Sequence, residues 1–378
     1  MNVAFHDPLA AYRELQAEID DAVARVLGSG RYVGGGEVEA FEAAFADHCG
    51  AGHCIGVANG FDALHLGLRA LGIGAGDEVI VAANSFAATV LAVRAVGACP
   101  VFVEPSEATF NLDPERAEAA IGPRTRAILP THLYGQPADL QPLLALARRH
   151  GLALVEDAAQ AHGARYRGRP IGAHGDLVAW SFYPTKNLGA MGDGGAVTTN
   201  DPTVAAAVRT LGQYGIERDR SAASLGVNSR LDPLQAAILA VKLPHIEAWN
   251  LRRRRIADLY CEGIGDTEVA LPHAPAWADP AWHLYVVRTV ERDVLRRWLA
   301  DRDIATDVHY PVPPHLQPAF VQPDIGRGAF PVAERLAAEV LSLPIGPHLG
   351  DDAVGAVIDA VRAWDRARRD AAPRAGAG

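Results

Sequence analysis

The segment LVAWSFYPTKNLGAMGDGGAVTTN, residues 177–200, joins two apolar runs through a glycine-rich turn. The runs at 177–182 and 195–200 are typical of buried strands. Lys186 lies between them, beside glycines that let the backbone pack closely against a flat ligand. A lysine is ordinarily a solvated surface charge, but burial lowers its pKa and frees its amine to attack an aldehyde. The segment therefore predicts two strands of one sheet and a reactive amine at their connection.

Further apolar runs precede this segment and alternate with helical patterns, as in FDALHLGLRALG (61–72) and DLQPLLALARRHG (139–151). Strands that are apolar on both faces and separated by helices indicate a parallel sheet covered on both sides, which binds ligands near the carboxyl ends of its strands. We therefore expect an α/β fold with a mostly parallel seven-stranded sheet and helices on both faces. Its first five strands are predicted at CIGVAN (54–59), EVIVAA (78–83), CPVFVE (99–104), RAILPTH (126–132) and LALVEDA (152–158).

A long helical pattern at 231–260 leads out of this alternation. The remainder contains a strand pattern at 282–289 and helical patterns at 291–302 and 354–364, which suit a small α+β domain. We expect a large domain with an N-terminal helical segment at residues 1–250 and a small C-terminal α+β domain at 251–370. Residues 371–378 are expected to form a disordered tail.

The composition and charge of the chain argue against some classes of binding partner. A formal net charge of −10 disfavours wrapping of nucleic acid. The N-terminus lacks the pattern of a secretory signal, and no run approaches the ~18 apolar residues of a membrane span, so a cytoplasmic location without a membrane partner is expected. The four cysteines form no C-x-x-C pair and are expected to be small buried hydrophobes rather than disulfides or metal ligands.

Two further stretches contain candidate ligand-binding residues. VANGFDALHLGL (57–68) is a strand that ends at Asn59-Gly60 and turns into a helix, whose free N–H groups and positive dipole end suit a phosphate; the alternative is an ordinary Asn-Gly turn. The strand at 152–158 delivers Glu156 and Asp157, whose side chains point to opposite faces. We assign Asp157 to the site, where its carboxylate could pair with a protonated ring nitrogen; a helix N-cap is the alternative.

The strings EDAAQAHGA (156–164), SFYPTKNLGA (181–190), GDGGAV (192–197) and NSRLDPLQAAIL (228–239) resemble signatures of the DegT/DnrJ/StrS sugar aminotransferases, which use pyridoxal phosphate (PLP). The similarity runs from about Ala11 to Ala367, and it implies a fold-type I PLP-dependent transferase fold like that of aspartate aminotransferase. Within that family the strings ANGFDAL (58–64), THLYGQPADL (131–140), HYPVPPHL (309–316) and LSLPIGPHL (341–349) are similar to enzymes that aminate carbon 3 of dTDP-3-keto-6-deoxyhexoses, as in the desosamine, mycaminose and 3-amino-3,6-dideoxyglucose pathways.

The resemblance implies a role for individual cofactor residues. Lys186 matches the lysine that forms a Schiff base with PLP, Asp157 the partner of the pyridinium nitrogen, and Gln160 the residue beside the ring hydroxyl. The residues that match phosphate and ring contacts are Asn59, Gly60 and Phe61 in the phosphate turn, Ser181 as a second phosphate contact and Phe86 as the stacking aromatic.

Contacts with the sugar nucleotide and the partner subunit follow in the same way. Tyr183, His309 and Tyr310 match substrate contacts, although Tyr183 could be a core residue and the other two ordinary loop residues. Asn228 matches an asparagine that reaches the phosphate from the other subunit, which implies a homodimer.

The stretch LGQYGIERDRSAASLG (211–226) departs from the family pattern. Gln213 replaces an asparagine, and Asp219 and Arg220 stand where relatives usually carry a lysine and then a tyrosine. That lysine is thought to reach the partner's substrate, so either Arg218 or Arg220 is expected to supply the positive charge.

The resemblance implies transamination of a nucleotide-linked keto-sugar, with L-glutamate as amino donor and pyridoxamine phosphate as the intermediate form of the cofactor. Three alternatives stay open: amination of carbon 4 of an NDP-4-keto-hexose, dehydration of a sugar, and a PLP-binding regulator without transferase activity. Lys186 argues against the dehydratases, because the best-known of them carry histidine in its place.

Overall fold

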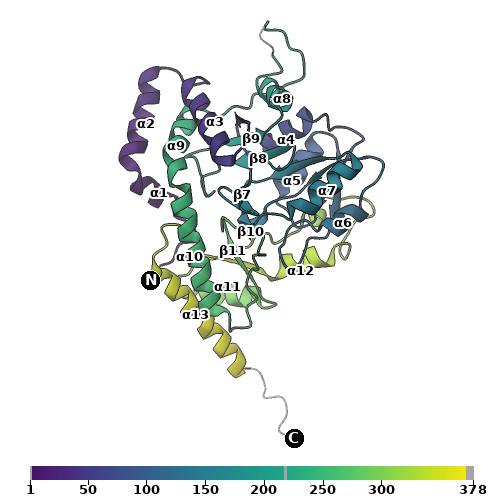
Figure 1. The fold of residues 1–378 in the computed structure, drawn as a ribbon. Coiled ribbons are helices and arrows are strands. Elements are labelled where there is room, and N and C mark those ends of the chain that lie inside the picture. The colour runs from purple at the N-terminus through teal and green to yellow at the C-terminus, as the bar shows by residue number, and fades with distance from the viewer. Residues whose placement is uncertain (1, 217–218, 372–378) are drawn as a thin grey trace.

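The computed structural model describes residues 2–216 and 219–371, and a seven-stranded sheet lies at its centre (Figure 1). The strand order is β1-β9-β8-β5-β4-β2-β3. β9 runs antiparallel to both of its neighbours, and all other strand pairs that follow it toward β3 are parallel. The seven predicted strands and the mostly parallel sheet are therefore confirmed. The bounds are β1 His53–Val57, β2 Glu78–Ala82, β3 Cys99–Val103, β4 Thr125–Leu129, β5 Ala153–Asp157, β8 Leu177–Ser181 and β9 Gly195–Thr199.

Helices cover both faces of this sheet, as predicted. In β2, Val79 and Val81 belong to one apolar core, whereas Ile80 and Ala82 belong to the core on the opposite face, because successive strand residues point to opposite sides. The first core lies under α4 (Gly60–Ala70), α5 (Ala87–Ala95) and α8 (Pro202–Gly212). The second lies under α3 (Gly36–Cys49), α6 (Pro114–Ala119), α7 (Leu140–His150) and α9 (Pro233–Lys242).

The predicted long helix at 231–260 is interrupted. α9 ends at Lys242, a 3₁₀ turn spans Leu243–His245, and α10 continues over Ile246–Ile264. Pro244 explains the break, since its ring removes a backbone donor and disfavours a continuous α-helix. On α10 the predicted burial of Cys261 is wrong: this residue is exposed, although its sulfur lies 3.3 Å from the Tyr285 hydroxyl.

The C-terminal elements pack around a third apolar core. β11 (Tyr285–Arg288) and β12 (Val340–Leu343) form an antiparallel pair, and α10, α11 (Arg292–Ala300), α12 (Pro331–Glu339) and α13 (Asp351–Ala371) accompany it. Val3 joins this core through a parallel bridge to Ile304. The expected boundary at residue 250 falls inside α10, so one continuous helix runs across it (Figure 1). The division into domains stays a prediction, and the expected tail lies, apart from Ala371, outside the described residues.

The shorter elements complete the chain. α1 (Pro8–Glu14) and α2 (Gln16–Ser29) form the N-terminal helical segment, and Ala22 and Val26 of α2 pack against Ala237 of α9. A small three-stranded sheet is made of β6 (Arg165–Tyr166), β7 (Arg169–Pro170) and β10 (Ala278–Asp279). In the described part of the chain, no helix is both long enough and apolar enough to cross a membrane.

Candidate active site

The carboxyl ends of β1, β5 and β8 meet at one edge of the sheet, which brings Asn59, Asp157 and Ser181 to the same side. Glycines permit the close approach there. A Cβ at Gly60 would lie 2.6 Å from the Cβ of Ser181, and one at Gly195 would lie 2.4 Å from the carbonyl carbon of Asn59. Any larger side chain at either glycine would push the turn after β1 away from Ser181.

The turn after β1 presents the N-terminus of α4 to this edge. Asn59 is the N-cap residue, and its side-chain oxygen accepts a hydrogen bond from the Asp62 N–H at 2.8 Å. The N–H groups of Gly60 and Phe61 donate to no acceptor among the described residues. Asn59 therefore does cap a helix, and the same turn leaves two backbone donors at the positive end of the helix dipole, where an anion is stabilised.

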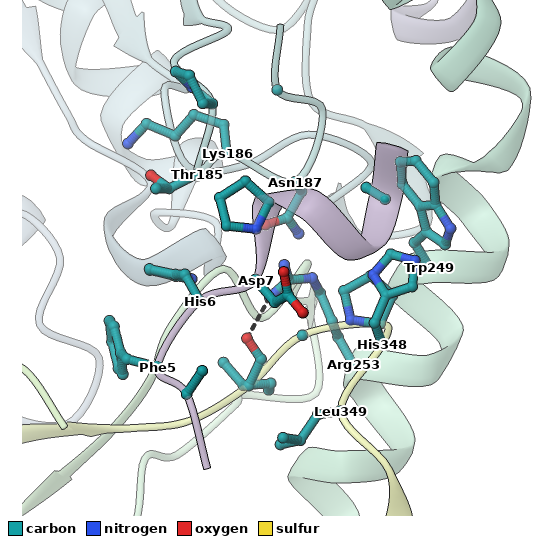
Figure 2. Close-up of a pocket in the computed structure, with 18 of the residues that line it drawn as sticks. Phe5, His6, Asp7, Thr185, Lys186, Asn187, Trp249, Arg253, His348 and Leu349 are labelled. Carbon is teal, nitrogen blue, oxygen red and sulfur yellow. Dashed lines mark hydrogen bonds between the residues drawn. The ribbon is translucent and has the colours of Figure 1, made fainter. Parts of the chain in front are cut away.

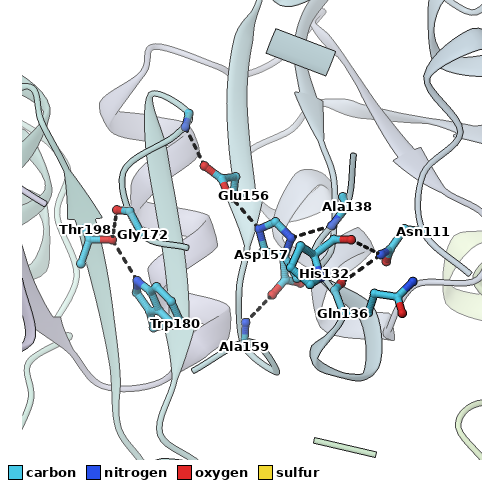
Figure 3. Close-up of polar contacts among 12 residues, drawn as sticks. Asn111, His132, Gln136, Ala138, Glu156, Asp157, Ala159, Gly172, Trp180 and Thr198 are labelled. Carbon is cyan, nitrogen blue, oxygen red and sulfur yellow. Dashed lines mark hydrogen bonds and ion pairs between the residues drawn. The ribbon is translucent and has the colours of Figure 1, made fainter. Parts of the chain in front are cut away.

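Glu156 and Asp157 point to opposite sides of β5, as predicted (Figure 3). The carboxylate of Glu156 lies 2.9 Å from His132 Nε2 and accepts a hydrogen bond from the Gly175 N–H at 2.6 Å. The carboxylate of Asp157 accepts a hydrogen bond from the Thr89 hydroxyl at 2.7 Å and one from the Ala159 N–H at 3.2 Å. The latter bond closes a short turn and no helix follows it, so the N-cap alternative for Asp157 is wrong.

Thr89 is a site residue that the sequence reasoning missed. It is fully buried on the first turn of α5, three residues after Phe86, and its hydroxyl fixes the orientation of the Asp157 carboxylate. The helical spacing from Phe86 in NSFAAT was the available signal, since residues three apart share one face of a helix.

Lys186 lies in the turn after β8, where its backbone N–H donates to the Tyr183 carbonyl at 2.8 Å. Burial lowers the pKa of its amine to about 8, and the negative charge of Asp157 partly opposes that shift. Burial also lowers the pKa of the neighbouring His162 to about 3 and that of His283 well below its ordinary value, and the charge of Lys186 adds to both shifts. Two neutral imidazoles thus accompany an amine whose neutral form is accessible near physiological pH.

Aromatic and amide groups form a second wall. Gln160 accepts a hydrogen bond from the Tyr134 N–H at 2.6 Å and donates one to the Tyr310 hydroxyl at 3.0 Å. The ring centroids of Tyr310 and Phe86 are 5.1 Å apart, and Nδ1 of His309 lies 2.8 Å from the Ser342 hydroxyl. Residues from three distant parts of the sequence are therefore brought together here.

Two aromatic side chains remain exposed beside this wall. Tyr183 is 53% exposed and Phe86 is 48% exposed, so the alternative that places Tyr183 in the core is wrong. Exposed aromatic rings next to a buried amine offer stacking surfaces to a flat ligand.

Arg220 and Asn228 lie elsewhere in this chain, in a hairpin after α8 that projects from the top of the view in Figure 1. Bridges between Gln213 and Asn228 and between Ile216 and Ala222 hold the hairpin. Arg220 and Asn228 are exposed, and Asp219 accepts hydrogen bonds from Ser221. Arg218, the other candidate for the positive charge, lies outside the described residues.

The sequence of the chain matches a known enzyme family. A model of the DegT/DnrJ/EryC1/StrS aminotransferase family matches residues 13–362. The chain is 55% identical to the erythromycin biosynthesis sensory transduction protein EryC1 of Saccharopolyspora erythraea, over 96% of this chain and 100% of the relative. It is also 55% identical to a dTDP-3-amino-3,4,6-trideoxy-α-D-glucose transaminase of Streptomyces venezuelae, over 96% of each chain.

Solved structures agree with these relatives. The crystal structure of S. venezuelae DesV in complex with a ketimine intermediate superposes with a TM-score of 0.95 at 55% identity, covering 96% of this chain and 98% of DesV. The α/β architecture described above is therefore the fold-type I fold of these transferases. The chain belongs to the DegT/DnrJ/EryC1/StrS family and is a PLP-dependent sugar aminotransferase.

Proposed function

We propose that the protein transfers an amino group from L-glutamate to carbon 3 of a dTDP-3-keto-6-deoxyhexose, in the biosynthesis of a deoxyamino sugar. The observation that carries the proposal is the convergence of Lys186, Asp157 and the Asn59–Phe61 turn at one edge of the sheet. The names of the S. venezuelae transaminase and of other relatives, which specify dTDP-3-amino sugars, support this choice of substrate.

The residues at this edge fit PLP. The two free N–H groups of Gly60 and Phe61, together with the Ser181 hydroxyl, suit its phosphate. The fixed carboxylate of Asp157 suits its ring nitrogen, Gln160 suits the ring hydroxyl, and Phe86 offers an exposed ring for stacking.

When bound, PLP acts as an electron sink for the carbanion that forms at the α-carbon of the donor. Lys186 provides the amine that holds the cofactor and then moves a proton at its Nζ, first away from the donor and later toward the sugar. Its pKa of about 8 suits both directions, because the neutral and protonated forms lie close in free energy near neutral pH. The Asp157 carboxylate would pair with the ring nitrogen of the bound cofactor.

We further propose a homodimer in which the projecting hairpin of one subunit completes the site of the other. Tyr214, Ile216 and Leu225 of this hairpin are 49%, 43% and 89% exposed, which is unusual for apolar side chains clustered on one element and favours an interface. In this arrangement Asn228 contacts the cofactor phosphate and Arg220 the sugar nucleotide of the partner, while Tyr183, His309 and Tyr310 contact the substrate of their own subunit.

The test is a reaction of the purified holoenzyme with L-glutamate and a panel of dTDP-3-keto and dTDP-4-keto hexoses. Mass spectrometry and NMR identify the aminated carbon. We expect 2-oxoglutarate and a product aminated at carbon 3. A product aminated only at carbon 4 contradicts the substrate assignment and leaves the reaction type intact.

The regulatory alternative deserves the same assay, because one relative is named a sensory transduction protein. A regulator would bind glutamate or the sugar nucleotide without forming 2-oxoglutarate, and a dehydratase would release water without transferring an amine. The buried amine of Lys186 favours transamination over dehydration, whereas a PLP-binding regulator could keep this lysine, so the formation of 2-oxoglutarate decides between transferase and regulator. The cytoplasmic location stays a prediction.

A further inference from the structure

A cavity of about 400 Å³ lies beneath the loop that carries Lys186. Five parts of the sequence form it: the stretch 2–11, the loop 184–191, Lys242 at the end of α9, α10 with Trp249 and Arg253, and the stretch 345–353 (Figure 2). Its size falls within the range of pockets that bind small metabolites. None of the predicted cofactor or sugar residues except Lys186 lines it.

Arg253 contributes a buried cation to this cavity. The side chain is 5% exposed, and its hydrogen bonds all come from Nη1, to the carbonyls of Trp282 at 3.1 Å and of His283 and Ile345 at 3.3 Å. Nε is buried without a partner, and Nη2 donates no hydrogen bond to any described residue. Burial alone lowers the pKa of Arg253 to about 10, so it stays charged at neutral pH. Nη2 is thus the guanidinium nitrogen that is free for a ligand, whereas Nε is enclosed by protein.

Lys242 contributes a second cation. The chain contains two lysines, Lys186 and Lys242, and both line this cavity. Lys242 is 5% exposed, its amine donates to the Gly189 carbonyl at 2.7 Å, and burial alone lowers its pKa to about 8. Asp7 is the carboxylate in the lining, and it accepts a hydrogen bond from the Ala10 N–H at 3.1 Å. Buried cations without a counter-ion are costly, so the lining favours an anionic ligand.

We propose that this cavity is a carboxylate-binding subsite for the amino donor, in which the free Nη2 of Arg253 donates a charge-assisted hydrogen bond to a carboxylate oxygen and Lys242 adds positive charge. A hydrogen bond from a charged guanidinium to a carboxylate is stronger than one between neutral groups. The loop of Lys186 forms the opposite wall, so a ligand held on Arg253 lies next to the residue that must exchange places with the donor amine. The inference rests on the proposed function, since it names the residues that bind the donor.

The test separates the two half-reactions of the holoenzyme. One is followed by the spectral change of the bound cofactor with L-glutamate, and the other with the dTDP-amino sugar. Arg253→Gln is expected to raise the glutamate concentration for half-maximal rate by roughly 10- to 100-fold, since a charge-assisted hydrogen bond is lost. Lys242→Met should raise it by a smaller factor, and both variants should keep the amino-sugar half-reaction within about twofold.

Arg255→Gln is the matched control, because Arg255 lies two residues further along α10 with its side chain 66% exposed, and it should leave both half-reactions unchanged. Glutarate, which has two carboxylates and no amine, provides a readout without turnover. It should raise the melting temperature of the wild-type holoenzyme and of Arg255→Gln, and not that of Arg253→Lys, whose shorter side chain carries no donor to the position of Nη2.

Unchanged glutamate dependence in both Arg253→Gln and Lys242→Met overturns the inference. So does a defect confined to the amino-sugar half-reaction, which would assign the cavity to the nucleotide. If Arg253→Gln does not fold, Lys242→Met and the glutarate measurement on Arg253→Lys decide. If the keto-sugar is never aminated while the glutamate half-reaction still depends on Arg253, the proposed function fails and the subsite stands.

Discussion

The carboxyl edge of the sheet and the hairpin after α8 are built in contrasting ways. At the edge, buried groups such as Asp157 and Gln160 are held by hydrogen bonds within the chain. In the hairpin, Leu225 and Asn228 are exposed, the bridges pair its two arms, and Arg69 of α4 donates a hydrogen bond to the Leu225 carbonyl. The difference shows that hydrogen bonds within one chain hold the residues of the amine chemistry in place, and it supports the proposal that the hairpin acts in the site of a second chain.

The largest expected effect tests the role of Lys186 at the carboxyl edge of the sheet. Lys186→Ala should lower kcat by about 10⁴-fold, because a general acid–base group and the covalent anchor of the cofactor are lost together. Lys242→Arg should stay within about tenfold, since it keeps its charge. Steady-state assays measure both, and borohydride reduction followed by peptide mapping should find the pyridoxyl group on Lys186 alone. Label on Lys242, or multiple turnovers by Lys186→Ala, would reject the assignment.

A smaller effect distinguishes the two carboxylates of β5. Asp157→Asn should lower kcat by roughly 10²- to 10³-fold with little change in stability, because an oriented charge at the ring is lost. Glu156→Gln should instead cost about 1–3 kcal/mol of unfolding free energy, since the contacts with His132 and Gly175 weaken. Assays and thermal unfolding measure the pair. Equal losses of activity in the two variants would contradict the assignment of Asp157 to the reaction and of Glu156 to stability.

The hairpin is tested by mixing subunits. Asn228→Ala should weaken cofactor affinity by about tenfold or more, through the loss of a hydrogen bond to a charged group. If Asn228 acts across a dimer, co-refolded Lys186→Ala and Asn228→Ala chains form hybrids with one intact site, and activity at limiting PLP should recover to about a quarter of wild type. Recovery no greater than the sum of the two variants alone would mean that Asn228 serves its own subunit.

The sequence predicted the sheet well because each strand is apolar on both faces, a pattern that few other structures share. Pro244 marked the break between α9 and α10, but the apolar period on either side of it outweighed the proline. Thr89 and Arg253 were not predicted, since their residue types are ordinary on helices and their burial depends on the tertiary packing. The role of Arg220 stays a prediction for a different reason: in the proposed homodimer, its environment would depend on the arrangement of two chains.

The smallest effect probes the environment of Lys186 directly. Its ordinary pKa of 10.5 falls to about 8, and only the neutral amine can attack an aldehyde, so the rate at which apoenzyme captures PLP should rise with pH and level off above about 8. A group with that pKa is about one-tenth neutral at pH 7 and nine-tenths neutral at pH 9, which gives an increase of about tenfold. Stopped-flow absorbance measures the rate.

Variants locate the cause of that pH dependence. Lys242→Arg should leave the midpoint in place, which shows that the other lysine of similar pKa is not the group observed. Asp157→Asn should move the midpoint to lower pH, because the carboxylate raises the pKa of Lys186 and its removal leaves burial unopposed. A midpoint near 10 in the wild type would mean that Lys186 is solvated in the apoenzyme. The contrast between the buried carboxyl ends of the strands and the exposed hairpin would then not hold at Lys186, the residue that performs the proton transfer.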